Sequence, residues 1–248
     1  MCGLTDIGGR DRRVARCVMM KKAIEANRNI IIQKLGQTWC WLPYVQYLKR
    51  QFSAENRMLI PRDQRYMLHS SDGRVRNNCM ERALEYVLRN LHEPIDAYHL
   101  RNVHEQICHG TNVVGGTIRQ SEVWLPELNV TPPPPDSIYY RLEDVLYRIS
   151  DTNVPTVQRA LQAHYDLLEL QPYTDFNKRT ARMVMNWILL KDEYSPIVFN
   201  KPTDRNLYVD AIANKSTKGY YEGFFRHVLL RSQEDLMRYL ARVDKQHK

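Results

Sequence analysis

The stretch that decides the fold is Leu170-Gln171-Pro172-Tyr173-Thr174-Asp175-Phe176-Asn177-Lys178-Arg179-Thr180-Ala181-Arg182, which joins two strongly helical segments. After Asp175, apolar residues recur at spacings of three and four as far as Leu190, so the second helix is predicted to begin near Asn177 or Lys178. The first N–H groups of a helix point outward, and the helix dipole favours negative charge there. The loop therefore predicts an anion-binding site at the start of this helix.

The side chains around this helix start suit a bound polyphosphate. Arg179 and Arg182 are three residues apart and share a helix face, from which their planar guanidinium groups can bracket phosphate oxygens. Asp175 can hold Mg²⁺, which usually takes one or two protein carboxylates together with phosphate oxygens. The plainer alternative is a capped helix with a solvated basic first turn.

The order of residues resembles the active-site loop of the Fic/Doc family, His-Pro-Phe-x-Asp/Glu-Gly-Asn-Gly-Arg-x-x-Arg. Six loop positions fit this pattern: Pro172, Tyr173 (in place of Phe), Asp175, Asn177, Arg179 and Arg182. Three positions depart from it: Gln171 for the His, Phe176 for the first Gly and Lys178 for the second Gly, where the Doc branch also carries Lys. The resemblance extends from about Asn77 to Leu240.

This family mostly transfers AMP from ATP to a Ser, Thr or Tyr hydroxyl of a target protein, and its Doc branch transfers phosphate. The resemblance implies ATP and Mg²⁺ as cofactors, with Asp175 on the metal. Asn177 and Arg179 would then contact phosphates, and Lys178 would add a cation. Arg182 would grip the terminal phosphate.

Gln171 stands where the family His removes the proton of the attacking hydroxyl. An amide cannot take that proton near neutral pH, and general-base catalysis contributes about 10²–10⁴ in rate. The resemblance therefore implies a protein adenylyltransferase of weak or lost activity. Two alternatives stay open: a non-catalytic pseudoenzyme that binds nucleotide or protein, and a Doc-like phosphotransferase.

The predicted fold class is all-α, a Fic-like helical core with one small β-hairpin. Helices are predicted at 12–35, 139–149, 157–169, 204–214, 219–230 and 233–243. The hairpin is predicted over Gly115–Leu125. In the family the equivalent flap aligns the target chain by strand addition, which implies target contacts from Gly116, Thr117, Ile118 and Arg119. The alternative is a simple connecting hairpin.

Two domains are predicted, an N-terminal helical extension over 1–75 and the Fic-like core over 76–248, with a turn at 70–73. Within the helix at 12–35, Lys21 to Asn27 resembles the inhibitory motif of Fic proteins, Ser/Thr-x-x-x-Glu-Gly/Asn. In such proteins the Glu pairs with the second loop Arg, so the resemblance implies an ion pair between Glu25 and Arg182. The alternative is a solvated Glu25 that pairs with a neighbouring Lys.

The chain of 248 residues has a formal charge of +8 and a globular composition. Its five cysteines form no C-x-x-C pair, which indicates reduced thiols and a cytoplasmic protein. It contains no apolar run of membrane-spanning length. The basic charge permits nucleic-acid binding, but no helix-turn-helix or zinc finger accompanies it. The expected partner is a target protein that offers a hydroxyl.

Four histidines are expected to be ordinary surface or core residues. His99, His104 and His109 are spaced by five, which does not place them on one helical face as a metal site would require. His164, in the helix that leads into the loop, is expected to be a buried structural residue.

Overall fold

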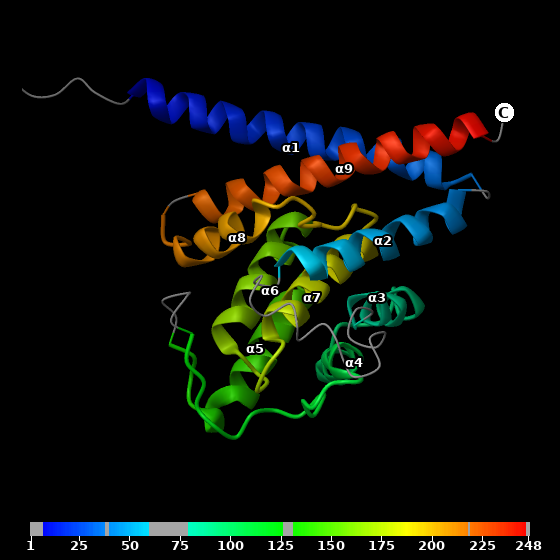
Figure 1. The fold of residues 1–248 in the computed structure, drawn as a ribbon. Coiled ribbons are helices and arrows are strands. Elements are labelled where there is room, and N and C mark those ends of the chain that lie inside the picture. Colours follow the sequence, from blue (N-terminus) through cyan, green and yellow to red (C-terminus); the bar gives the residue numbers. More distant parts are fainter. Residues whose placement is uncertain (1–6, 38–39, 60–78, 126–130, 218, 247–248) are drawn as a thin grey trace, which may run out of the picture.

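Helices make up most of the described chain (Figure 1). The computed structural model describes residues 7–37, 40–59, 79–125, 131–217 and 219–246, and only the backbone of residues 7–17. The elements are α1 (Ile7–Leu35), α2 (Trp41–Leu59), α3 (Cys79–Arg89), α4 (Ala97–Cys108), the 3-10 helix η5 (Pro135–Ser137), α5 (Ile138–Ser150), α6 (Thr156–Leu170), α7 (Asn177–Lys191), α8 (Asp204–Ala213) and α9 (Tyr220–Gln246). Among these residues, no helix is both long and apolar enough to cross a bilayer.

Helix α7 forms the centre of the fold. Every side chain from Thr180 to Leu190 is buried, and a helix buried on all sides must be enclosed by other elements. Helix α6 packs along it in the middle of Figure 1, with the pair α1 and α9 across the top and α3 and α4 at the lower right. The N-terminus of this central helix is where the sequence predicts the anion site.

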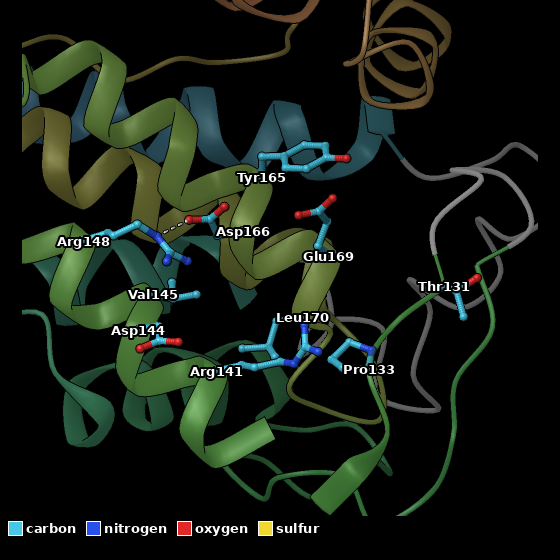
Figure 2. Close-up of a pocket in the computed structure, with 10 residues that line it drawn as sticks. All are labelled: Thr131, Pro133, Arg141, Asp144, Val145, Arg148, Tyr165, Asp166, Glu169 and Leu170. Atoms are coloured by element: carbon cyan, nitrogen blue, oxygen red, sulfur yellow. Dashed lines mark hydrogen bonds and ion pairs between the residues drawn. The ribbon is translucent and has the colours of Figure 1, made fainter. Parts of the chain in front are cut away.

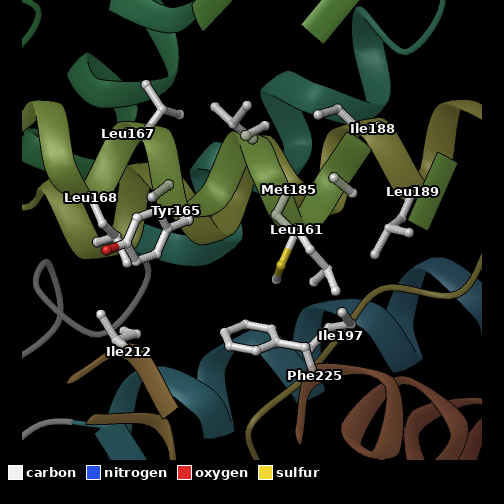
Figure 3. Close-up of a cluster of buried hydrophobic side chains, with 14 of the residues drawn as sticks. Leu161, Tyr165, Leu167, Leu168, Met185, Ile188, Leu189, Ile197, Ile212 and Phe225 are labelled. Carbon is white, nitrogen blue, oxygen red and sulfur yellow. The ribbon is translucent and has the colours of Figure 1, made fainter. Parts of the chain in front are cut away.

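Two faces of α7 join two hydrophobic clusters. Met183 and Trp187, one turn apart, pack with side chains of α2, α3 and α4. Met185 belongs to the other cluster, with α5, α6, α8 and α9. Figure 3 shows Met185 and Leu161 of α6 directed toward Phe225 of α9. The position of α7 is therefore fixed by packing from both sides.

Most of the predicted helices are confirmed. The predictions at 12–35, 139–149, 157–169 and 204–214 correspond to α1, α5, α6 and α8, and α7 begins at Asn177. The predicted boundary between 75 and 76 and the turn at 70–73 lie outside the described residues.

The prediction of two separate helices at 219–230 and 233–243 is wrong, because α9 is continuous from Tyr220 to Gln246. Two polar residues at the predicted break are buried and form hydrogen bonds while they remain helical. Ser232 Oγ accepts the N–H of Val198 (3.2 Å), and Gln233 Nε2 donates to the carbonyl of Ile24 (3.0 Å). These distant partners each bind one polar atom of side chains that would otherwise favour a solvated break.

The predicted hairpin over Gly115–Leu125 is not shown within the described residues, which stop at 125 and resume at 131. Instead, Ile118 makes an isolated antiparallel bridge with Tyr173 of the loop. A Cβ on Gly115 would lie 2.7 Å from Cα of Glu105, and Gly116 has a φ of +73°, so both positions favour glycine. The segment thereby runs closely past α4 and pairs with the loop.

The dependence of the fold on α7 can be tested at Trp187, whose side chain is fully buried and donates to the carbonyl of Leu91 (3.2 Å). Trp187→Ala leaves a large cavity and should lower the free energy of unfolding by about 3–5 kcal/mol. Guanidinium denaturation measures this loss. Tyr147→Ala, at a side chain that is 78% exposed, is the control and should change stability by less than about 0.5 kcal/mol. Equal losses would contradict the central role of α7.

Candidate functional site

The loop between α6 and α7 is bounded by two residues with left-handed backbone. Gln171, the C-cap of α6, has φ 44°, and Phe176, the N-cap of α7, has φ 57°. This conformation costs roughly 1–2 kcal/mol for a residue with a Cβ, so surrounding contacts must hold it. The loop is therefore a strained segment fixed by its neighbours.

Asn177 closes the loop on itself. Its Oδ1 accepts the N–H of Tyr173 (2.9 Å), and its Nδ2 donates to the carbonyl of the same residue (2.7 Å). The family resemblance assigns this side chain to phosphate contact. In this structure both of its polar atoms instead form hydrogen bonds with the loop backbone. Asn177 is buried and is the first residue of α7, so these bonds hold the loop in place at the start of the helix.

Arg119 holds the other side of the loop. Its backbone N–H donates to the carbonyl of Pro172 (3.0 Å), and its Nε donates to the carbonyl of Gln171 (2.7 Å). The other guanidinium nitrogens reach the carbonyls of Ser121 and Pro133. Because the side chain is only 1% exposed, Arg119 supports the loop from within. The expected target contact of this segment is therefore left to its backbone and its exposed side chains.

His104 of α4 joins the loop to the 115–125 segment. Its Nδ1 accepts the N–H of Gly116 (2.8 Å), so the proton is on Nε2, which donates to the carbonyl of Asp175 (3.0 Å). The ring stacks on Tyr173 with centroids 3.7 Å apart. Burial lowers the pKa of His104 to about 4, which keeps the imidazole neutral near pH 7. No side-chain pattern predicts this role, because both hydrogen-bond partners are backbone groups.

Arg182 makes a buried ion pair with Glu55 of α2. Its Nε donates to Glu55 Oε1 (2.7 Å), and its Nη1 donates to the carbonyl of Lys178 (3.1 Å). The second carboxylate oxygen accepts the N–H of Phe199 (3.2 Å). Burial raises the pKa of Glu55, while the charge of Arg182 opposes that rise. The guanidinium therefore already holds a carboxylate.

The predicted ion pair between Glu25 and Arg182 is wrong. Glu25 is exposed, and its Oε1 accepts the hydroxyl of Tyr194 (2.7 Å). The sequence did contain a signal for the correct partner, since Glu55-Asn56 matches the Glu-Gly/Asn end of the inhibitory motif. Gln51 at the Ser/Thr position obscured it.

The remaining charged loop residues gather at the first turn of α7. Asp175 is exposed, and its Oδ1 accepts the N–H of Phe176 (2.6 Å). The guanidinium of Arg179 lies over the ring of Phe176, 4.5 Å from its centroid. Lys178 is half-buried beside them. The structure thus places Asp175, Lys178 and Arg179 at the first turn of α7, while Arg182 lies in the next turn and pairs with Glu55.

Gln171 does not present its amide to this cluster. The side chain is 4% exposed, and its Nε2 donates to the carbonyl of Leu168 (2.8 Å). The amide caps the end of α6. The backbone geometry of this position is therefore supported by the side chain itself.

A cavity of about 550 Å³ lies between α5, α6 and residues 131–133 (Figure 2). Arg148 and Asp166 form an ion pair at its wall (3.0 Å). The cavity reaches the loop at Leu170, and within the described residues the charged side chains of the loop do not line it. Arg182 is directed instead toward α2.

Comparison with known proteins identifies the segment around this loop. Residues 94–189 match the model of the Fic/DOC family. Protein adenylyltransferase fic-1 of Caenorhabditis elegans is 30% identical over 132 residues, which are 52% of this chain and 25% of the relative. Protein adenylyltransferase Fic of Drosophila willistoni is 31% identical over 102 residues, or 40% and 20% of the two chains. The chain spans about a quarter of the length of these relatives.

Solved structures share the fold. Fic-1 (residues 134–508) of C. elegans has a TM-score of 0.64 at 20% identity and matches 95% of this chain and 78% of that one. A Fic domain containing signaling protein of Bacteroides thetaiotaomicron has a TM-score of 0.66 at 14% identity, over 90% and 96% of the two chains.

The neutral, buried state of His104 predicts a pH dependence of stability. The unfolded residue protonates near 6.5 and the folded residue near 4, so the unfolded chain binds more protons between these values. Stability should therefore be full above about pH 6.5 and fall as the pH is lowered toward 4, by about 3 kcal/mol from this group.

Urea denaturation at pH 7 and pH 4 measures this effect. His104→Phe keeps an aromatic ring on Tyr173 but cannot titrate, so its stability should fall about 3 kcal/mol less over the same range. An identical fall in both proteins would show that His104 is not held neutral.

Proposed function

The chain carries a domain of the Fic/Doc family over residues 94–189, and we propose that it transfers AMP from ATP to a hydroxyl side chain of a target protein, with an activity that Gln171 weakens or abolishes. The adenylyltransferase names of its relatives support AMP as the transferred group. The observation that carries the proposal is the buried Arg182 near the start of α7, whose guanidinium is already paired with the carboxylate of Glu55. A phosphate would use the same planar, charge-assisted hydrogen bonds.

Asp175 is the proposed Mg²⁺ ligand. Its exposed carboxylate lies at the same helix terminus as Arg179 and Arg182. Within the described residues, no three His, Cys, Asp or Glu side chains form a metal cluster. A single carboxylate fits Mg²⁺ that keeps its waters and shares phosphate oxygens with the nucleotide. When bound, the metal would neutralise charge on those oxygens.

The loop residues supply orientation and charge to the phosphates. Arg179, Lys178 and the first N–H groups of α7 would contact the phosphate oxygens, and Arg182 would hold the terminal phosphate. Asn177 contributes by keeping the loop closed on Tyr173. Positioning and electrostatic stabilisation are the terms on which phosphoryl and nucleotidyl transfer depend most.

Gln171 limits the chemistry. The attacking hydroxyl needs a base, and the amide here is both unable to take a proton and turned back to cap α6. Phe176 further narrows the approach to the phosphates, because a ring stands where the family carries Gly. The site therefore retains side chains that would bind and position the nucleotide, but lacks a side chain that would remove the proton of the attacking hydroxyl.

Helix α2 is the proposed inhibitory element, in place of α1. Glu55 occupies the Arg182 guanidinium that the terminal phosphate would need. Nucleotide can reach this arginine only if the carboxylate withdraws. The N-terminal extension over 1–75 would then regulate the core over 76–248, through α2.

The segment from Gly116 to Arg119 is the proposed docking edge for the target. Ile118 is bridged to Tyr173 on one side, and Thr117 and Gln120 are exposed. An extended segment with a free side can bind another chain through backbone hydrogen bonds without a sequence requirement. The acceptor hydroxyl would be brought beside the loop in this way.

The inhibitory role of Glu55 predicts the effect of its removal on ATP affinity. Glu55→Ala should tighten the binding of ATP with Mg²⁺ by about 10- to 100-fold, because Arg182 gains a charge-assisted contact of about 1.5–3 kcal/mol. Isothermal titration calorimetry measures the affinity. Glu25→Ala is the matched control and should leave the ATP affinity unchanged. Glu55→Ala should likewise leave the affinity unchanged when it is added to a protein that already carries Arg182→Ala. A gain from Glu25→Ala would return the inhibitory role to α1.

The role of Gln171 predicts a gain of activity in the same background. Gln171→His with Glu55→Ala should raise label transfer at least about 10²-fold over Glu55→Ala alone, because it restores a base at the hydroxyl. Transfer is measured by incubation with lysate protein and ATP labelled at the α- or γ-phosphate. Label from the α position indicates AMP transfer, and label from the γ position alone indicates the Doc-like reaction.

Gln171→Asn is the control for this experiment, because an amide at that position cannot serve as the base. An absence of label with both nucleotides, despite ATP binding, would favour the pseudoenzyme alternative. Gln171→His also removes the amide cap on α6, which should lower the free energy of unfolding by about 0.5–1.5 kcal/mol. The variants are therefore compared at a temperature where each is folded.

A further inference from the structure

Four buried side chains from four helices form one hydrogen-bonded chain that ends at Arg182. His164 of α6 lies between two tyrosines, with Nδ1 2.6 Å from the hydroxyl of Tyr221 and Nε2 3.0 Å from the hydroxyl of Tyr208. The hydroxyl of Tyr208 is also a hydrogen-bond partner of Arg182, whose guanidinium lies 5.5 Å from the Tyr208 ring centroid. None of the three aromatic residues has a part in the chemistry proposed above.

One set of hydrogen-bond directions satisfies every group in this chain. The hydroxyl of Tyr221 donates to the carbonyl of Leu161 (3.1 Å), so it accepts the proton on His164 Nδ1. His164 Nε2 is then bare and accepts the hydroxyl proton of Tyr208. The Tyr208 oxygen is left as an acceptor toward Arg182, which only donates.

The surroundings make this arrangement costly unless it is fully satisfied. His164 is completely buried in the hydrophobic cluster, against the rings of Tyr208, Tyr221 and Phe225. A buried polar group without partners costs more than an apolar one of the same shape. Both ring nitrogens are paired, and burial together with the charge of Arg182 lowers the pKa of His164, so the ring stays neutral.

We propose that His164 is a positioning residue for Arg182, which acts through the Tyr208 hydroxyl. When Glu55 leaves, Arg182 keeps only the carbonyl of Lys178 and the Tyr208 oxygen as partners among those described above. His164 fixes the rotation of that hydroxyl, so its lone pairs face the guanidinium and Arg182 stays aimed at the start of α7. The inference rests on the proposed function, because it assigns Arg182 to the terminal phosphate of ATP.

The test uses two amide replacements that each copy one half of the imidazole. In His164→Gln the amide oxygen can reach the place of Nε2 and accept from Tyr208. In His164→Asn the shorter amide can reach the place of Nδ1 and donate to Tyr221, but nothing accepts from Tyr208. Both variants, with Tyr208→Phe, are made in the full chain carrying Glu55→Ala.

Calorimetry with ATP and with AMP, each with Mg²⁺, gives the first readout. His164→Asn and Tyr208→Phe should weaken ATP binding about 3- to 10-fold, the worth of a typical hydrogen bond, and leave AMP binding unchanged because AMP lacks the terminal phosphate. His164→Gln should bind ATP within about twofold of its parent, by the same measure. Melting temperatures are recorded for all variants. Equal losses for Gln and Asn that follow the melting temperature would overturn the proposal in favour of a purely structural His164.

Crystal structures of the nucleotide-free Gln and Asn variants give a readout that does not depend on ATP. The Arg182 guanidinium should stay beside Tyr208 in the Gln variant and leave it in the Asn variant. An unmoved guanidinium in both would overturn the positioning role. A moved guanidinium in a protein that never binds ATP would instead support the positioning role and count against the proposed function.

Discussion

The rest of the structure depends on one buried ion pair, between Arg182 and Glu55. Both side chains are almost fully out of water, at 4% and 0% exposure, and two such charges are tolerated only when their remaining donors and acceptors are also paired. The N–H of Phe199 pairs with Glu55, and the carbonyl of Lys178 and the hydroxyl of Tyr208 pair with Arg182. A charged pair of this kind contributes little net stability, so its presence at the core of a helical fold points to use.

The ion pair also adds a polar contact between two helices that share one hydrophobic cluster. Glu55 lies on α2 and Arg182 on α7, 127 positions later. Because α7 is buried from Thr180 to Leu190 and packs into both hydrophobic clusters, Arg182 is the fixed partner, and release of the pair requires movement of the Glu55 side chain. An anion site can be controlled when the core holds its cation rigidly and a polar contact holds the competing carboxylate.

The sequence was sufficient to predict what depends on neighbours along the chain. Spacing over a few residues predicts the helices that have periodic apolar residues and the start of α7. It also predicts charged residues close together in the chain from Asp175 to Arg182. The failures concern partners that are distant in sequence. Glu25 and Glu55 both lie on helices with similar local patterns, and only the packing of α2 against α7 distinguishes them.

The same reason explains the other corrections. Ser232 and Gln233 interrupt an apolar pattern, and their partners Val198 and Ile24 belong to other elements, so α9 continues where local rules suggested a stop. From the sequence, His104 is expected to be an ordinary surface or core histidine, and Arg119 is expected to belong to a flap. Their hydrogen-bond partners are backbone groups of the loop and of residues 116–133, which no side-chain pattern in the sequence can reveal.

The geometry of the loop separates the binding of an anion from the removal of a proton. Gln171 and Phe176 keep the left-handed backbone at both ends of the loop although neither is glycine, and Arg119, Asn177 and His104 together hold that strained shape. A chain that had lost every use for the loop would gain stability by relaxing it, because each strained residue costs roughly 1–2 kcal/mol. The contacts that preserve the strain all support the turn that is proposed to bind phosphate, and none of them requires a base at position 171. The loop is thus consistent with a site whose nucleotide-binding part is maintained independently of its catalytic part.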